Sequence, residues 1–431
     1  MRFFVALFLI ILASEAANSQ VRFNSLSELL QYADAHAPMA LQASMLPKLS
    51  KQDVNTQASG LYPKVNAFGT GDYYPIIATQ VIPGEIINQP GTYVKAQFGL
   101  PYVFTSGAEL IMPVVNMEKW AQLSKAKAAQ TQSEFTSKQT IELFHILLMQ
   151  SYYQYLITKE VLELNDENAE TAAELARIIK ASNDNGVVNP SDFNRTKNLT
   201  LDVQIAGIGY NKQLDITKSG IDSMLNIKED SLLLTEDITA FNWPLLEQAG
   251  NPMNRSGWKE ADYKLKVAEY SLDESRNSAF PKLSLSGRYW YTMQSKLESS
   301  KSNVDFNTAS VSARLDFPIF QGNYYRSVKN KSKLQLQIAK LDNDRIHASL
   351  TEQQNSWYTQ YRAAFSKHTI LDEKVKNASD NLRIAKLSIK EGLMEFDQFN
   401  NIFAEYNRAR MEQLQNLADG ILYYLLSTQN F

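Results

Sequence analysis

Two long stretches of this chain almost lack helix-breaking residues, and they constrain its fold more than any other feature. Residues 114–182 contain neither proline nor glycine, and residues 321–391 contain a single glycine, Gly322. As α-helices, which rise ~1.5 Å per residue, each stretch would extend on the order of 100 Å. Globular helices seldom exceed ~25 residues, so helices of this length need neighbouring helices to cover their apolar side chains. The sequence therefore predicts an extended helical assembly.

Heptad spacing within these regions predicts coiled-coil packing. The 4-3 spacing occurs at Phe144, Leu148, Ser151, Tyr155, Thr158 and Leu162, and again at Leu414, Leu417, Ile421 and Tyr424. Such spacing keeps side chains on one seam against a neighbouring helix. Turn-forming residues around Gly186 and Gly392 end the long stretches, so each should fold back on a second helix. The expected helices cover ~114–182, ~191–227, ~321–391 and ~397–427.

The two halves of the chain share one plan. Tyr-Pro-Lys-Val at 62–65 is echoed by Phe-Pro-Lys-Leu at 280–283. Three further landmarks recur in the same order: Ala37-Pro38 with Asn251-Pro252, Met112-Pro113 with Phe317-Pro318, and Gly186 plus Asp192 with Gly392 plus Asp397. Recurrence in a fixed order indicates an internal duplication. We therefore expect a signal peptide at 1–19, a first repeat at 20–228, a connector at 229–250 and a second repeat at 251–431.

Each repeat also contains two segments that alternate as β-strands do. Ala309, Val311, Ala313 and Leu315 alternate with polar residues, which places apolar and polar side chains on opposite faces. The expected strands cover ~62–78, ~92–112, ~281–296 and ~304–318. This pattern fits a transmembrane β-barrel, and it equally fits an antiparallel sheet with one face in water. Tyr73, Tyr74, Tyr289, Trp290 and Tyr291 could form an aromatic girdle or simply pack within the sheet.

Four strands cannot close a barrel, which needs at least ~8, and an open edge in lipid leaves backbone groups unsatisfied. Three copies would supply twelve strands. In such a barrel the polar strand face would line the lumen, and its candidate residues are Arg288, Arg314 and Asp316.

The N-terminus has the plan of a secretory signal peptide. Arg2 precedes an unbroken apolar run at 3–13, and small residues follow it, so cleavage after Ala16 or after Ser19 fits equally. A retained anchor helix is the alternative, although the run is short for a membrane span. The chain has no cysteine, which excludes disulfides, thiolate metal sites and a lipid on an N-terminal cysteine. Its formal net charge of -3 gives no sign of nucleic-acid binding.

These landmarks together resemble those of the TolC-like outer-membrane efflux proteins, over nearly the whole mature chain. The resemblance rests on 26–30 (Leu-Ser-Glu-Leu-Leu) with Ala37-Pro38, on 280–285 (Phe-Pro-Lys-Leu-Ser-Leu), on 315–322 (Leu-Asp-Phe-Pro-Ile-Phe-Gln-Gly), and on 390–399 around Gly392 and Asp397. It implies a mainly α fold with transmembrane β structure: a homotrimer in which a twelve-stranded β-barrel continues into an α-helical barrel.

The resemblance also implies a function and its partners. The protein would lie in the outer membrane of a Gram-negative bacterium, among its lipids, with its helices in the periplasm. It would passively conduct substrates for efflux or type I secretion, energised by an inner-membrane pump through a periplasmic adaptor. The hairpin tips Gly186, Val187, Gly392 and Leu393 would dock the adaptor, and Asp192, Asp397 and Asn400 are candidates for the tunnel aperture.

Two departures from the family pattern concern the aperture. Asn400 stands where relatives can carry a second acidic residue, and Gly392 lies five rather than six positions before Asp397. Asp192 and Asp397 also open their return helices, where the helix dipole alone favours an acidic residue.

No catalytic, cofactor-binding or metal-binding residues are expected. The four histidines are isolated in the sequence, and no zinc-binding or phosphate-binding motif is present. The alternatives to a duct are a periplasmic adaptor, which normally has one helical hairpin, and a secreted coiled-coil structural protein.

Overall fold

The computed structural model describes residues 21–88, 90–184, 189–228, 232–296 and 303–428. Within these ranges the chain forms two units. The first contains the described parts of 1–47, 133–261 and 344–431, and the second contains 48–132 and the described parts of 262–343. The proposed signal peptide and the tip residues Gly186 and Val187 lie outside the described residues.

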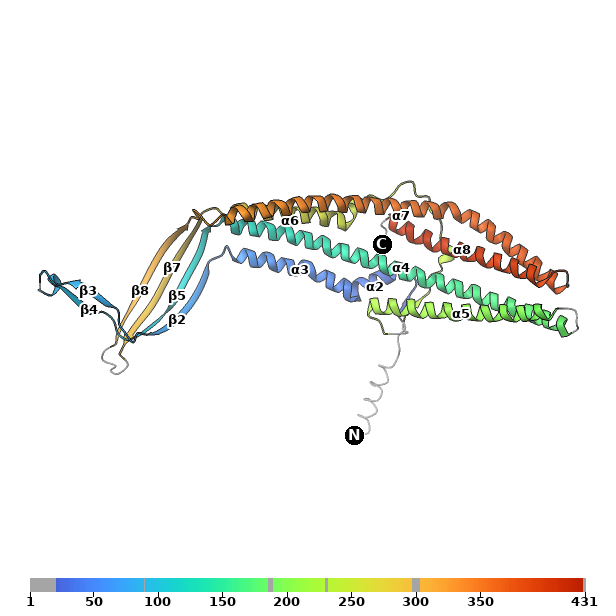
Figure 1. The fold of residues 1–431 in the computed structure, drawn as a ribbon, viewed down its shortest axis with the longest axis horizontal. Coiled ribbons are helices and arrows are strands. Elements are labelled where there is room, and N and C mark those ends of the chain that lie inside the picture. Colours follow the sequence, from blue (N-terminus) through green and yellow to red (C-terminus); the bar gives the residue numbers. More distant parts are fainter. Residues whose placement is uncertain (1–20, 89, 185–188, 229–231, 297–302, 429–431) are drawn as a thin grey trace, which may run out of the picture. The chain divides into compact units, whose positions relative to one another are not determined.

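The second unit is built on a four-stranded antiparallel sheet (Figure 1). Its strands are β2 (Lys64–Tyr73), β5 (Tyr102–Val115), β7 (Lys282–Ser295) and β8 (Val304–Asp316), in the order β2-β5-β7-β8. Each repeat contributes two adjacent strands, and the repeats meet where β5 pairs with β7. Among the described strands, β2 and β8 pair on one side only.

The expected strand at ~92–112 is divided into two strands that belong to different sheets. Its beginning is β4 (Tyr93–Gln97), which pairs with β3 (Thr79–Pro83) in a separate hairpin. The break falls at Gly99, whose φ of 117° is inaccessible to most residues, and it is followed by Pro101. The alternation of the sequence did not reveal this break, because both pieces are rich in strand-forming residues.

The long helices form two hairpins that run into the first unit. The first hairpin is α4 (Met117–Asp184) with α5 (Pro190–Leu225), and the second is α7 (Tyr324–Lys390) with α8 (Phe396–Thr428). Both long helices begin three residues later than expected: β5 extends to Val115, and Gly322 and Asn323 have positive φ before α7. Shorter helices, α2 (Leu26–His36), α3 (Pro38–Ser59) and α6 (Ser256–Asn277), precede the strands of each repeat.

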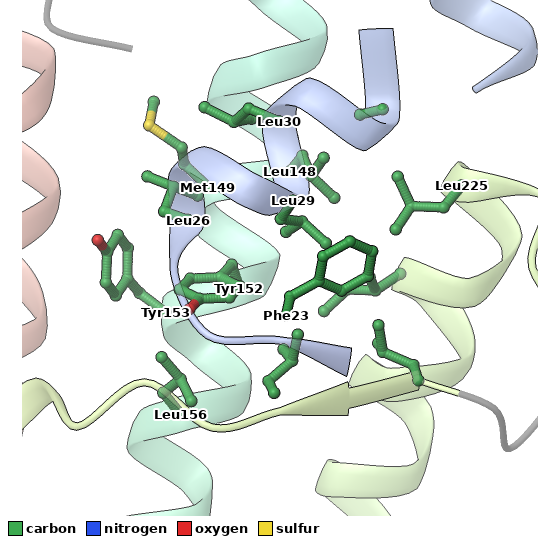
Figure 2. Packing of buried hydrophobic residues seen from close by; sticks show 14 of the residues in the cluster. Phe23, Leu26, Leu29, Leu30, Leu148, Met149, Tyr152, Tyr153, Leu156 and Leu225 are labelled. Atoms are coloured by element: carbon green, nitrogen blue, oxygen red, sulfur yellow. The ribbon is translucent and has the colours of Figure 1, made fainter. Parts of the chain in front are cut away.

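The main core of the first unit surrounds a short parallel pair of strands, β1 (Val21–Phe23) and β6 (Leu232–Leu234) (Figure 2). Figure 2 shows Phe23, Leu29 and Tyr152 converging there from the N-terminal segment and from α4. The buried Tyr152 hydroxyl donates a 2.5 Å hydrogen bond to Glu236, and burial raises the pKa of that phenol. Glu236 also accepts the backbone N–H of Leu26, so one carboxylate fixes the start of α2.

The connector between the repeats is held on the second hairpin by aromatic side chains. Trp243 stacks on His368 with ring centroids 4.7 Å apart, and it covers Gly420 of α8. The Tyr361 hydroxyl donates to the carbonyl of Pro244, and burial raises the pKa of this phenol to about 12. Phe241 also packs against Tyr424 of α8, and the Tyr358 hydroxyl of α7 donates to the carbonyl of Glu247, so the connector is held on α7 and α8 from 241 to 247.

Candidate functional site

The polar face of the four-stranded sheet carries the residues predicted to line a lumen. Arg288, Arg314 and Asp316 lie on one face, because Arg288 pairs with Ser310 and Arg314 pairs with Ser284 in the register of β7 and β8. Arg314 donates a 2.9 Å hydrogen bond to Asp316. The face therefore presents paired charges together with hydroxyl groups to its surroundings.

Arg288 is held by aromatic rings on this polar face. Its guanidinium carbon lies 4.2 Å from the Phe68 ring centroid and 5.0 Å from that of Trp290. Phe68 and Trp290 flank Gly107 in the register of β2, β5 and β7. Gly107 is required there, because a Cβ atom would lie 2.3 Å from the Tyr289 carbonyl and 2.7 Å from the Trp290 Cβ. Phe68 and Trp290 therefore position Arg288, for which the sequence alone indicated no contact.

The opposite face of the sheet is apolar and exposed. Val311 is 89% exposed and Leu315 is 67% exposed, and Tyr289 lies on the same face. Trp290 points to the other face beside Arg288, so the aromatic residues considered for a girdle do not all share one side. An exposed apolar face of this kind marks an interaction with lipid or with another protein.

The tips of the two hairpins are joined by one charged pair. Arg195 of α5 contacts both carboxylate oxygens of Asp397 on α8, at 2.6 and 2.7 Å. Asp192 lies one turn before Arg195, with a carboxylate oxygen 4.0 Å from the same guanidinium nitrogen. Two of the three aperture candidates therefore meet on one arginine, whereas Asn400 lies partly buried farther along α8.

The sequence did not predict Arg195 as part of this cluster. Its spacing from Asp192 fits an ion pair within one helix, but its strongest contact is with the other repeat. At the turn of the second hairpin, Gly392 has a φ of 72° and the following Leu393 is 81% exposed. This turn presents an apolar side chain to its surroundings.

A buried ion pair lies in the first unit. Arg255 donates to Glu142 at 2.7 Å and to Gln353, and its guanidinium lies 4.7 Å from the centroid of the Trp357 ring. The two charged side chains are 5% and 14% exposed. Arg255 thereby connects the segment before α6 with α4 through Glu142 and with α7 through Gln353 and Trp357.

No helix within the described parts of the chain is both long enough and apolar enough to span a bilayer. No protein-family model and no sequence of a curated protein matches the chain.

Solved structures do match it over almost its full length. The outer membrane protein VceC of Vibrio cholerae has a TM-score of 0.75 at 12% identity, covering 94% of this chain and 96% of VceC. The outer membrane channel CmeC of Campylobacter jejuni has a TM-score of 0.72 at 14% identity, covering 93% and 84% of the two chains. For the outer membrane channel MtrE of Neisseria gonorrhoeae, the TM-score is 0.69 at 15% identity, with 94% and 89% covered.

The chain therefore has the fold of bacterial outer-membrane channels. The fold implied by the resemblance to TolC-like proteins is confirmed: two repeats, each with two sheet strands and a long helical hairpin.

Proposed function

We propose that this protein is an outer-membrane exit duct that conducts substrates passively across the cell envelope. Three copies would close a twelve-stranded barrel in the outer membrane of a Gram-negative bacterium, and their hairpins would form a tunnel in the periplasm. The observation that carries this proposal is the sheet, which has one apolar exposed face, one polar face and two edges that are unpaired among the described strands.

The sheet supports the proposal through the requirements of backbone hydrogen bonding. In a bilayer the unpaired edges of β2 and β8 would leave N–H and C=O groups without partners. Pairing β8 of one copy with β2 of the next satisfies them, and three copies close the ring. Thirteen residues of β8, at ~3.3 Å each and tilted by about 45°, cover roughly 30 Å, the thickness of the hydrocarbon core.

Fractionation and conductance test this proposal together. We expect the full-length protein to be exported, to require detergent for release from the outer membrane, and to produce ion-conducting pores in planar bilayers. A freely soluble periplasmic monomer without conductance would refute the duct. A periplasmic adaptor, the main alternative, normally has one hairpin, whereas this chain has two hairpins and a four-stranded sheet.

We further propose that the contact between Arg195 and Asp397 restrains the periplasmic aperture. The two side chains are 50% and 63% exposed, so the pair stabilises the tip only weakly, by roughly 0.2–1 kcal/mol. A weak contact suits a reversible restraint. We expect Arg195→Ala and Asp397→Asn to raise single-channel conductance or open probability. Arg383→Ala is the control, since its ion pair with Asp380 lies within one helix. Unchanged conductance in both tip variants would contradict the aperture role.

Docking of a periplasmic adaptor, and through it an inner-membrane pump, would use the hairpin tips Gly186, Val187, Gly392 and Leu393. Leu393 offers the sharpest test, because its exposed side chain can be changed without straining the turn at Gly392. We expect Leu393→Glu to abolish pump-dependent export while conductance in bilayers persists. Export at the normal rate would refute docking through this turn.

A further inference from the structure

The segment between β8 and α7 exposes three large apolar side chains, which we call the apolar segment. Phe317 is 62% exposed, Ile319 is 90% exposed and Phe320 is 82% exposed. Phe317 and Ile319 continue the odd-numbered alternation of Val311 and Leu315, which lie on the apolar face of β8. The apolar character of that face therefore extends past the end of the strand to the start of α7.

A basic patch follows on the first turns of α7. Arg326, Lys329 and Lys333 have a 3-4 spacing, so they share one face of the helix. All three are exposed, and within the parts of the chain that the structure describes none of them forms a hydrogen bond or an ion pair. The sequence has no acidic residue from 317 to 341. The positive charge of the patch is therefore available to a partner.

The first repeat does not carry the same patch. When the helix starts Met117 and Tyr324 are aligned, Lys119 stands where the second repeat has Arg326, but Gln122 and Ala126 take the places of the two lysines. The next cation of α4, Lys125, is bound to Glu274 at 3.0 Å. A long helix after the sheet therefore does not itself require three unpaired cations, and each copy carries one such patch.

The patch lies away from the polar face of the sheet. Tyr324, Val328 and Ser332 of α7 line a cavity of about 350 Å³ together with Lys282, which pairs with Asp316 in the register of the polar face. The three cations do not line this cavity. With ~3.6 residues per turn, they lie on a different side of α7 from the residues that do. Since the polar face is the one proposed to line the lumen, the patch would lie on the outside of the barrel.

We propose that the apolar segment and the basic patch together bind an anionic phospholipid of the periplasmic leaflet. The apolar segment would contact the acyl chains, and the guanidinium and ammonium groups of the patch would contact the phosphate. Apolar side chains followed by cations match the order of acyl chains and head groups across a leaflet. The inference rests on the proposed function, because it needs β8 in the membrane and α7 in the periplasm.

The dimensions of the patch suit a membrane surface. From Arg326 to Lys333 the helix rises about 10 Å, and physiological salt screens charges beyond ~8 Å. Arg326 and Lys329 would therefore contribute most to binding, at about fivefold in affinity for each cation near the surface. An acidic protein would also complement the cations, but the apolar segment continues the face proposed to contact lipid, which favours a lipid.

Native mass spectrometry of the full-length protein in detergent, titrated with lipid, tests the cationic half of the site. We expect phosphatidylglycerol to bind more tightly than zwitterionic phosphatidylcholine with the same acyl chains. Arg326→Gln combined with Lys329→Gln should weaken phosphatidylglycerol binding about fivefold for each cation removed and leave phosphatidylcholine binding unchanged. Lys212→Gln combined with Lys376→Gln, which removes two exposed cations from α5 and α7, is the control and should change neither.

The apolar half of the site has its own test. Ile319→Ser combined with Phe320→Ser should weaken binding of both lipids, because both present the same acyl chains. Soluble glycerophosphate at the lipid concentration should not displace phosphatidylglycerol. Displacement would show that the patch is a site for free phosphate and would overturn the lipid site.

The outcomes separate this inference from the duct. Ion-conducting trimers that bind the two lipids equally, or that lose phosphatidylglycerol as readily in the control as in the patch variant, would overturn the lipid site and leave the duct in place. A soluble monomer without conductance would refute the duct, and the lipid site with it.

Discussion

Arg255 is a cation held almost entirely out of water by Glu142, Gln353 and the face of Trp357. Removing one member of a buried ion pair leaves the other charge without compensation, which costs about 3–5 kcal/mol. We therefore expect Arg255→Met to lower the free energy of unfolding by that amount, measured by urea denaturation with helical circular dichroism.

The double variant Arg255→Met, Glu142→Leu is the matched control. It removes both charges, so it should recover much of the lost stability. Equal destabilisation in the single and double variants would show that the loss comes from packing on Trp357 rather than from the charge left behind.

At Gly420 there is no room for a side chain, because Trp243 of the connector, far away in the sequence, packs against it. A Cβ atom at this position would lie 2.3 Å from the ring of Trp243. Gly420→Ala should therefore displace the connector and destabilise the protein by roughly 1–3 kcal/mol. Thermal unfolding would report the loss, and Trp243 fluorescence would report the displacement.

Gly220→Ala is the control for helix propensity. Gly220 is also helical, but a Cβ atom there would meet nothing within 4 Å. This change should be neutral or stabilising by about 0.4–1 kcal/mol. If both variants behaved alike, the packing of Trp243 on Gly420 would not be what fixes the connector.

At the residue scale, the sequence predicted where a residue lies in its helix or strand better than which side chain it contacts. Asp397 could be assigned to the first turn of a return helix, because acidic residues are favoured there. Its contact with Arg195 could not be predicted, since the two residues belong to different repeats and no sequence period relates them. Arg255 and Glu142 were missed for the same reason.

At the scale of elements, the sequence predicted the faces of the sheet strands, but it missed one strand break and one short pair of strands. Period-two alternation identified the two faces of β7 and β8, and the register confirms that Arg288 and Arg314 lie on the same face of the sheet. The division between β4 and β5 depends on backbone conformation at Gly99, which alternation does not report. The parallel pair β1 and β6 was missed, because strands of three residues carry no usable period.

Adjacent residues on β8 provide a test of the strand faces. Val311 lies on the apolar face and Ser312 on the polar face, where its hydroxyl is 2.9 Å from that of Ser286. In outer membranes we expect Val311→Cys to react with a lipid-phase maleimide, and Ser312→Cys to react with a charged, water-soluble one. The two variants control each other, because they differ by one residue in depth.

The reverse labelling pattern would place the polar face toward lipid and would contradict the lumen assignment of Arg288, Arg314 and Asp316. Equal reaction of both cysteines with the water-soluble reagent would indicate an ordinary sheet with both faces in water.

For the whole molecule, the proposed self-association rests on what one copy leaves exposed. The sheet has an apolar face and two edges without partners among the described strands. The number of strands that each copy contributes to the four-stranded sheet could be predicted from the sequence, because each repeat shows two alternating segments.

The central claim is that one chain is an incomplete barrel and three chains close it. Native mass spectrometry of the full-length protein, extracted from outer membranes in detergent, tests this claim most directly. The account predicts a complex of three copies, with no substantial population of monomer or dimer. A stable monomer, or a complex whose copy number is not three, would contradict it.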